Sequence, residues 1–151
     1  MSERVTAARH RKARHEYEIL ETHEAGMVLL GTEVKSLREG KASIAEAYAS
    51  FRGEELYLRE MTIPEYSHSG YARHDPKRAR KLLLHRRELR KLKEALATEG
   101  LTLVPLEVYF KEGYAKVQLA LARGRKLHDK RQALRRAEAT REMRRAVGRR
   151  E

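Results

Sequence analysis

Cysteine is absent from the 151-residue chain, and long apolar runs are absent as well. The lack of cysteine excludes a disulfide framework, a thiol nucleophile and a Cys-ligated zinc. No apolar run approaches the roughly 18 residues of a transmembrane helix, and no apolar signal-peptide region follows the N-terminal Met1-Ser2-Glu3-Arg4. We therefore expect a cytoplasmic protein without a membrane partner.

Acidic residues are too few to balance the basic ones. The chain has 34 Lys+Arg against 22 Asp+Glu, a formal net charge of +12, which indicates a polyanionic partner. Residues 123–151 hold 12 Arg/Lys and 4 Asp/Glu, a net +8, which leaves only +4 for residues 1–122. The charge distribution predicts a folded domain, 1–122, and a basic C-terminal tail, 123–151. A tail that serves only solubility is the alternative.

Hydrophobic periodicity in the first third of the chain indicates two strands and a helix. Residues 15–22 alternate apolar with charged side chains, and residues 25–30 form a short apolar run, so the pair predicts a hairpin. Residues 31–40 predict a short helix that has Thr32 as its N-cap and ends at Gly40.

The remaining strands are short and close together in the sequence. A second hairpin is expected over residues 47–58, and a helix over residues 84–100. The clearest alternation lies in residues 104–110 and 115–121. Because Pro105 lacks an N–H, its strand should be an edge strand or carry a bulge there.

About six short antiparallel strands with two or three helices favour a closed barrel over a sandwich. Closure removes the exposed edges that such a small sheet would otherwise leave. We therefore expect a mainly β protein, an OB-like closed antiparallel barrel with flanking helices and a basic tail.

Two patterns invite an enzymatic interpretation, and both are disfavoured. Glu33-Val34-Lys35 matches part of a metal-dependent nuclease site, but such a site also needs an upstream Asp, and both Asp residues lie downstream. His128 and Asp129 are adjacent, so on a helix their side chains point about 100° apart and do not face each other. A general base also needs a dry pocket, which the flanking sequence does not offer. We expect no catalytic residues.

Histidines are the remaining candidates for chemistry, as metal ligands. None of the seven shows the spacing that places two ligands on one helix face, and His68 and His74 lie in a predicted loop. The sequence therefore predicts no metal site and no cofactor.

Several segments together resemble one family, the bacterial SsrA-binding proteins, also called small protein B. They are HEYEILETHEAG (15–26), GTEVKSLREGKASI (31–44), DPKRARKLLLHRREL (75–89), LVPLEVYFKEGYAKVQLALARGRKLHDKR (103–131) and the basic tail. The resemblance covers essentially the whole chain and implies an OB-like barrel of six strands. It also implies binding of transfer-messenger RNA and its delivery to ribosomes stalled on mRNA without a stop codon, where the nascent peptide is tagged for degradation.

The resemblance implies no enzyme activity in the protein itself. Elongation factor Tu and alanyl-tRNA synthetase would be indirect partners through the shared RNA. A general basic rRNA-binding or ribosome-associated protein is the alternative function.

The same resemblance implies a set of RNA-facing residues in the domain: Tyr17, Glu24, Lys35, Arg38, Leu83 and Lys116. The three cations can neutralise phosphates, and Tyr17 can stack on an unpaired base. Glu24 would accept hydrogen bonds from base amino groups or ribose hydroxyls. Core packing is the alternative for Tyr17 and Leu83, and a solvated turn carboxylate is the alternative for Glu24.

For the tail, the resemblance implies a ribosomal site, the empty mRNA channel and decoding centre of the stalled ribosome. The tail residues that would contact mainly small-subunit rRNA are Arg123, Gly124, Arg125, Lys126, His128, Asp129, Lys130 and Arg131. Because the tail has few apolar groups and a net +8 charge, we expect it to be disordered when free and helical on the ribosome. Family tails often carry a Trp, and this chain has none.

Overall fold

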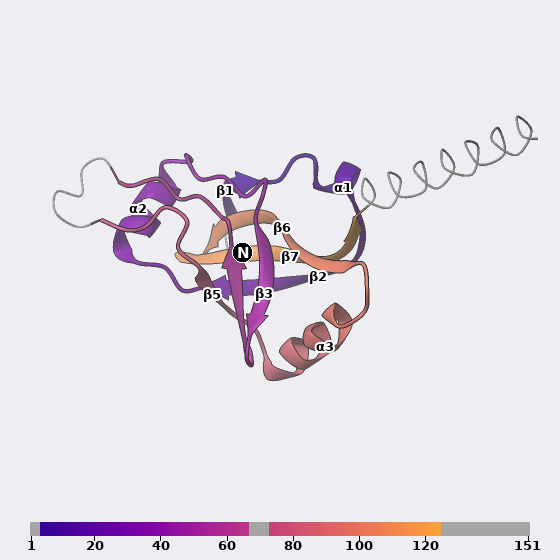
Figure 1. Ribbon diagram of the computed structural model, residues 1–151. Coiled ribbons are helices and arrows are strands. Elements are labelled where there is room, and N and C mark those ends of the chain that lie inside the picture. Colours follow the sequence, from indigo (N-terminus) through magenta and orange to yellow (C-terminus); the bar gives the residue numbers. More distant parts are fainter. Residues whose placement is uncertain (1–3, 67–72, 125–151) are drawn as a thin grey trace, which may run out of the picture.

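A computed structural model of the chain describes residues 4–66 and 73–124, which form ten elements around one barrel (Figure 1). The strands are β1 (Arg4–Arg9), β2 (Tyr17–Met27), β3 (Tyr48–Arg52), β4 (Glu55–Arg59), β5 (Arg80–Leu83), β6 (Leu101–Lys111) and β7 (Tyr114–Gly124). The helices are α1 (Ala13–Glu16), α2 (Gly31–Arg38) and α3 (Arg86–Leu96).

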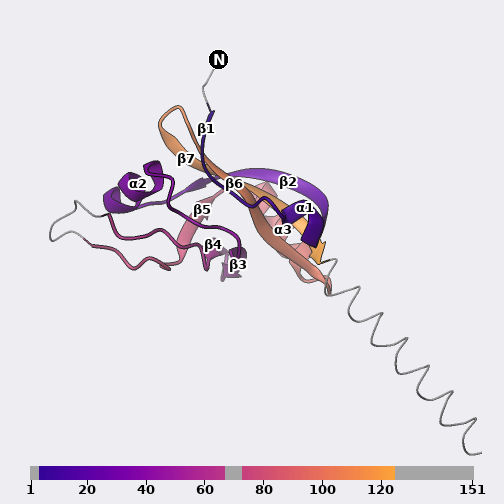
Figure 2. The same ribbon diagram turned by 90° about the horizontal axis from the view of Figure 1, so that it is seen from above.

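The sheet closes on itself. Its strands follow the order β1-β6-β3-β4-β5-β2-β7, and β7 also pairs with β6. Strands β2 to β7 therefore form a six-stranded antiparallel ring, while β1 adds to the outside of the ring along β6. Figures 1 and 2 show α2 and α3 at opposite ends of this barrel. The expected closed barrel is confirmed.

The first predicted hairpin is wrong, because β2 runs without a turn through Glu24-Ala25-Gly26. Gly26 pairs with Lys116 on one side and with Leu83 on the other, so it lies in the middle of the sheet. The polar, glycine-containing stretch looks like a turn in sequence, yet pairing on both sides keeps it extended.

The later elements agree better with their patterns. Strands β3 and β4 form the second hairpin around Gly53, which has a positive φ of 63°. Strand β6 carries a register shift between Pro105 and Glu107, so the bulge expected at the proline is confirmed. Helix α3 forms where predicted and buries Leu92.

Helix α2 begins differently from the prediction. Its N-cap is Leu30, whose backbone N–H donates to Glu33 Oε1 at 2.8 Å, so Thr32 is not the cap. The hydroxyl of Thr32 instead contacts His74 Nδ1 at 2.9 Å. The buried His74 also contacts the carbonyl of Ile63 through Nε2 at 2.8 Å, which fixes a loop against α2.

Inside the barrel, inward-facing residues of the six ring strands form the main apolar core. Leu56, Leu58, Leu103, Val117 and Leu119 are each fully buried. No helix of the described residues is long and apolar enough to cross a membrane.

Candidate nucleic-acid interface

One row of residues crosses five strands on the outer face of the sheet. In register from β5 to β1 it reads Leu83, Gly26, Lys116, Tyr109 and Thr6. Antiparallel neighbours in register lie about 5 Å apart, so this row brings together residues from distant parts of the chain. Two of the residues expected to face RNA, Leu83 and Lys116, lie in it.

An open pocket of about 520 Å³ lies over this row, and we call it the Lys116 pocket. Glu24, Leu83 and Lys116 line it, together with His85 and Glu88 at the start of α3. The pocket therefore contains three of the six domain residues expected to face RNA.

Gly26 keeps the floor of the Lys116 pocket open. A Cβ at this position would lie 3.5 Å from Leu83 Cβ and 3.8 Å from Lys116 Nζ, in ordinary van der Waals contact. Any longer side chain would then occupy the space between the apolar group and the ammonium. A ligand can approach the backbone closely at this point.

Glu24 presents an ionised carboxylate beside the pocket. The hydroxyl of buried Tyr109 donates to its Oε2, and Lys111 Nζ lies 3.6 Å from the same oxygen. The Tyr109 hydrogen bond is the main reason that the pKa of Glu24 lies below its ordinary value, and Lys111 and Lys116 add to the effect. Both contacts involve Oε2 and the Glu24 side chain is 41% exposed, so Oε1 is available as an acceptor for base amino groups or ribose hydroxyls.

Tyr109 belongs to the candidate interface through its contact with Glu24, and the sequence analysis did not predict it. Burial and its hydrogen bond to Glu24 raise the pKa of its hydroxyl, so the phenol stays a donor. The guanidinium of Arg4 covers the ring at 3.6 Å and pairs with Glu107 at 2.9 Å. The alternation of inward and outward side chains along β6 predicts that Tyr109 points away from the core, and it does. Strand β1 nevertheless buries it. Strand β1 itself has no clear alternation in the sequence.

Helix α3 is held against the same pocket by a histidine. Nδ1 of His23 lies 3.0 Å from Glu88, and Nε2 lies 3.2 Å from Glu21. His23 is on β2, which forms the floor of the Lys116 pocket, and Glu88 is on α3, which forms one wall. This contact therefore fixes the position of that wall relative to the floor.

The other three domain residues expected to face RNA lie elsewhere. Tyr17 begins β2, about 23 Å along the strand from Glu24, and its ring packs partly buried near His10. Lys35 and Arg38 lie on α2, where the Arg38 guanidinium covers Phe110 at 4.4 Å. All three are outside the Lys116 pocket.

Glu33, the carboxylate of the nuclease-like tripeptide, has a structural role. It is fully buried and pairs with Arg80 at 2.6 Å and with Arg78 at 2.5 Å. Burial alone would raise the pKa of Glu33, but the hydrogen bonds from Arg78, Leu30 and Arg80 outweigh it and lower the pKa. Across the described residues, no group of three His, Asp or Glu side chains could hold a metal ion.

The tail residues divide at the end of the last strand. Arg123 and Gly124 belong to β7, which extends two residues past the expected domain boundary, and Arg123 pairs with Glu18 at 3.8 Å. The remaining expected ribosome contacts, Arg125, Lys126, His128, Asp129, Lys130 and Arg131, lie outside the described residues.

Comparison with known proteins agrees with this geometry. Residues 7–149 match the family described as SmpB protein. A protein of Mycobacterium leprae named SsrA-binding protein is 58% identical over 143 residues, which are 95% of this chain and 89% of the relative. One of Salinispora arenicola with the same name is 55% identical over 147 residues, 97% of this chain and 92% of the relative.

A solved structure adds a three-dimensional match. It is described as "tmRNA-SmpB: a journey to the center of the bacterial ribosome" and superposes with a TM-score of 0.66 at 57% identity. The match covers 77% of this chain and 82% of that one. The barrel, the matched family and these relatives agree, and the chain belongs to the SmpB protein family.

Proposed function

We propose that the chain binds transfer-messenger RNA through the Lys116 pocket and delivers it to ribosomes stalled on mRNA without a stop codon. One observation carries the proposal: strands β2, β5 and β7 bring a carboxylate, an exposed apolar group and a cation into one open pocket. Family membership supports it, because the relatives are named SsrA-binding proteins and the matched structure is of tmRNA-SmpB and the ribosome.

Each of the three groups contacts a different part of the RNA. Lys116 contacts a phosphate, and Leu83, a residue that is 53% exposed, packs against an unpaired base. Glu24 accepts hydrogen bonds from a base edge or a ribose hydroxyl. A carboxylate repels phosphates, so its place beside Lys116 favours recognition of particular nucleotides over general binding to the RNA backbone.

Three further domain residues supply peripheral contacts. The exposed Lys35 and Arg38 on α2 attract phosphates at the α2 end of the barrel. Tyr17 offers the accessible part of its ring to a base at the far end of β2.

Delivery to the ribosome is assigned to the basic tail. Arg123 to Lys126 and His128 to Arg131 contact rRNA in the empty mRNA channel and decoding centre, where phosphates neutralise the net +8 charge of residues 123–151. The protein is an adaptor in the cytoplasm and not an enzyme. It meets alanyl-tRNA synthetase and elongation factor Tu only through the shared RNA.

The test is a reconstituted tagging reaction on ribosomes stalled at the end of an mRNA without a stop codon. We expect the wild-type chain to support tagging and Lys116→Ala to lose most of it at limiting protein. Tyr114→Ala, at an exposed position of the same strand, is the control and should retain it. If the wild-type chain supports no tagging with its own transfer-messenger RNA, the proposal is wrong.

A further inference from the structure

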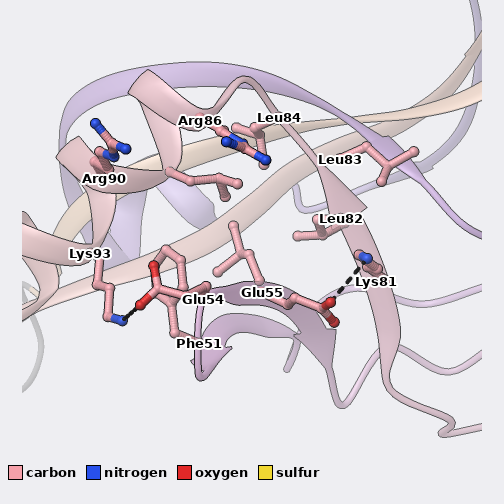
Figure 3. A pocket seen from close by; sticks show the side chains of 12 residues that line it. Phe51, Glu54, Glu55, Lys81, Leu82, Leu83, Leu84, Arg86, Arg90 and Lys93 are labelled. Carbon is pink, nitrogen blue, oxygen red and sulfur yellow. Dashed lines mark hydrogen bonds and ion pairs between the residues drawn. The ribbon is translucent and has the colours of Figure 1, made fainter.

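A second groove lies beside the Lys116 pocket, between α3 and the β3–β4 hairpin, and we call it the α3 groove (Figure 3). Its volume is about 540 Å³, within the range of pockets that hold small organic groups. Leu83 and Leu84 line both the α3 groove and the Lys116 pocket, so the two hollows lie next to each other on either side of this ridge. None of the residues assigned to RNA above, apart from Leu83, lies in it.

The charges along the α3 groove favour an anion. Lys81, Arg86, Arg90 and Lys93 line it against Glu54 and Glu55, which leaves a net +2. The two acids are already paired, Glu54 with Lys93 at 2.9 Å and Glu55 with Lys81 at 3.3 Å, and Figure 3 shows both contacts.

The two arginines are the cations that remain for a ligand. Neither the Arg86 nor the Arg90 side chain forms a hydrogen bond or ion pair within residues 4–66 and 73–124, and both side chains are exposed. Arg90 only adds at longer range to the effect of Lys93, which lowers the pKa of Glu54. They are four residues apart on α3 and therefore project from the same side of the helix. Two guanidinium groups in this arrangement suit the oxygens of a phosphate.

Beneath the arginines, the floor of the groove is apolar. Leu56 and Leu82 are buried there, and the half-buried ring of Phe51 and side chain of Leu89 complete it. An aromatic ring beside aliphatic groups provides a surface for an unstacked base. The cations at the rim suit the phosphate of a nucleotide, and the apolar floor suits its base.

We propose that the α3 groove binds an unpaired nucleotide of the RNA that occupies the Lys116 pocket. Its base lies against Phe51 and Leu89, and its phosphate contacts Arg86 and Arg90. The strand reaches the groove by crossing the ridge of Leu83 and Leu84. This inference rests on the proposed function, which it extends by a second subsite.

Other occupants fit the groove less well. The chain's own tail carries 12 Arg/Lys against 4 Asp/Glu, so its charge has the same sign as that of the groove. An acidic protein segment would satisfy the arginines, but the neighbouring Lys116 pocket gives it no advantage. An RNA strand that occupies the Lys116 pocket gains a second contact from the adjacent groove.

The test compares charge-matched double variants of the full chain. Arg86→Gln with Arg90→Gln removes the two arginines from the groove, and Arg14→Gln with Arg87→Gln removes two exposed arginines that do not line it. Affinity for the tRNA-like part of transfer-messenger RNA is measured over a series of salt concentrations. We expect the groove variant to bind about tenfold more weakly, with a log–log salt slope shallower by about 0.7 to 0.9 for each lost phosphate contact. The control should bind like wild type.

A third variant tests the base contact. Phe51→Leu keeps an apolar side chain, and we expect its affinity to fall at least about fivefold with an unchanged salt slope, because stacking is lost and no charge is removed. The groove proposal is overturned if both groove variants bind RNA like the control while Lys116→Ala still weakens binding. That outcome leaves the proposed function standing and shows that the RNA does not occupy the groove. If instead the wild-type chain shows no preference for transfer-messenger RNA, the proposed function itself fails.

Discussion

The guanidinium Nε of Arg80 lies 2.6 Å from Glu33 Oε2, and neither side chain is exposed. Arg80 also donates to the carbonyl of Met61 at 2.5 Å, and Glu33 accepts from the backbone N–H of Leu30 at 2.8 Å. This pair joins β5 to the start of α2. It therefore fixes the helix that presents Lys35 and Arg38 relative to the strand that presents Leu83.

Breaking this pair should destabilise the fold strongly. Arg80→Met leaves the buried carboxylate of Glu33 with Arg78 as its remaining cation and the Leu30 N–H as its remaining backbone donor. The loss of one partner of a buried ion pair costs about 3–5 kcal/mol of unfolding free energy. Urea unfolding measures it. Lys77→Met, which removes an exposed ion pair of 3.7 Å with Glu60, is the control and should change stability by less than about 1 kcal/mol. Equal effects of the two variants would contradict the structural role of Arg80.

Acid should remove the contribution of Glu33. Its pKa in the folded protein is below the ordinary value of 4.5, so its stabilising effect is fully present above that value and is lost as the pH falls through the folded pKa. The difference in unfolding free energy between wild type and Glu33→Gln should be largest near neutral pH and shrink below about pH 4. A series of urea titrations measures this difference, and a constant value down to pH 3 would refute the assignment.

Sequence patterns predicted the barrel because its strands alternate and its tight turns carry glycine. They failed where pairing in the folded chain decides the conformation. Gly26 resembles a turn residue, yet strands on both sides keep it extended. Tyr109 looks solvent-exposed on its strand, yet Arg4 from the unpredicted β1 covers it.

The candidate site was predictable only in part. Glu24, Leu83 and Lys116 came from family motifs, and the structure places them in one pocket. The hydrogen bond from Tyr109 to Glu24 joins residues 85 positions apart, and no local pattern of either segment signals it.

Removing the Tyr109 hydroxyl should affect Glu24. In Tyr109→Phe the pKa of Glu24 should rise, because the lost hydrogen bond is the largest cause of its lowering. Affinity for transfer-messenger RNA should fall about fivefold, as expected for one hydrogen bond. NMR titration of the Glu24 carboxyl carbon and binding at fixed salt measure the two effects. Tyr114→Phe, at a 71% exposed position, is the matched control. An unchanged pKa and affinity in Tyr109→Phe would show that Tyr109 does not position Glu24.

Changes in the tail should abolish tagging and leave the binding of transfer-messenger RNA nearly unchanged. We expect a chain that ends at Gly124, after the last strand, to bind transfer-messenger RNA within about tenfold of the full chain, because the Lys116 pocket is intact. The full chain with His128→Ala, or with Asp129-Lys130-Arg131 neutralised, should bind normally and fail to tag stalled peptides. Gel-shift binding and the reconstituted tagging reaction provide the two readouts. Full tagging by the truncated chain would contradict the ribosomal role of the tail.

Competition at fixed salt tests the central claim most directly. The wild-type chain is bound to the labelled tRNA-like part of transfer-messenger RNA and challenged with unlabelled ordinary tRNA or with the unlabelled specific RNA. Each phosphate contact adds about −0.7 to −0.9 to the log–log salt slope of the specific complex. We expect ordinary tRNA to compete about tenfold less well than the specific RNA. Equal competition by the two RNAs, with the same salt slope, would instead show a general basic RNA-binding protein and contradict specific binding of transfer-messenger RNA.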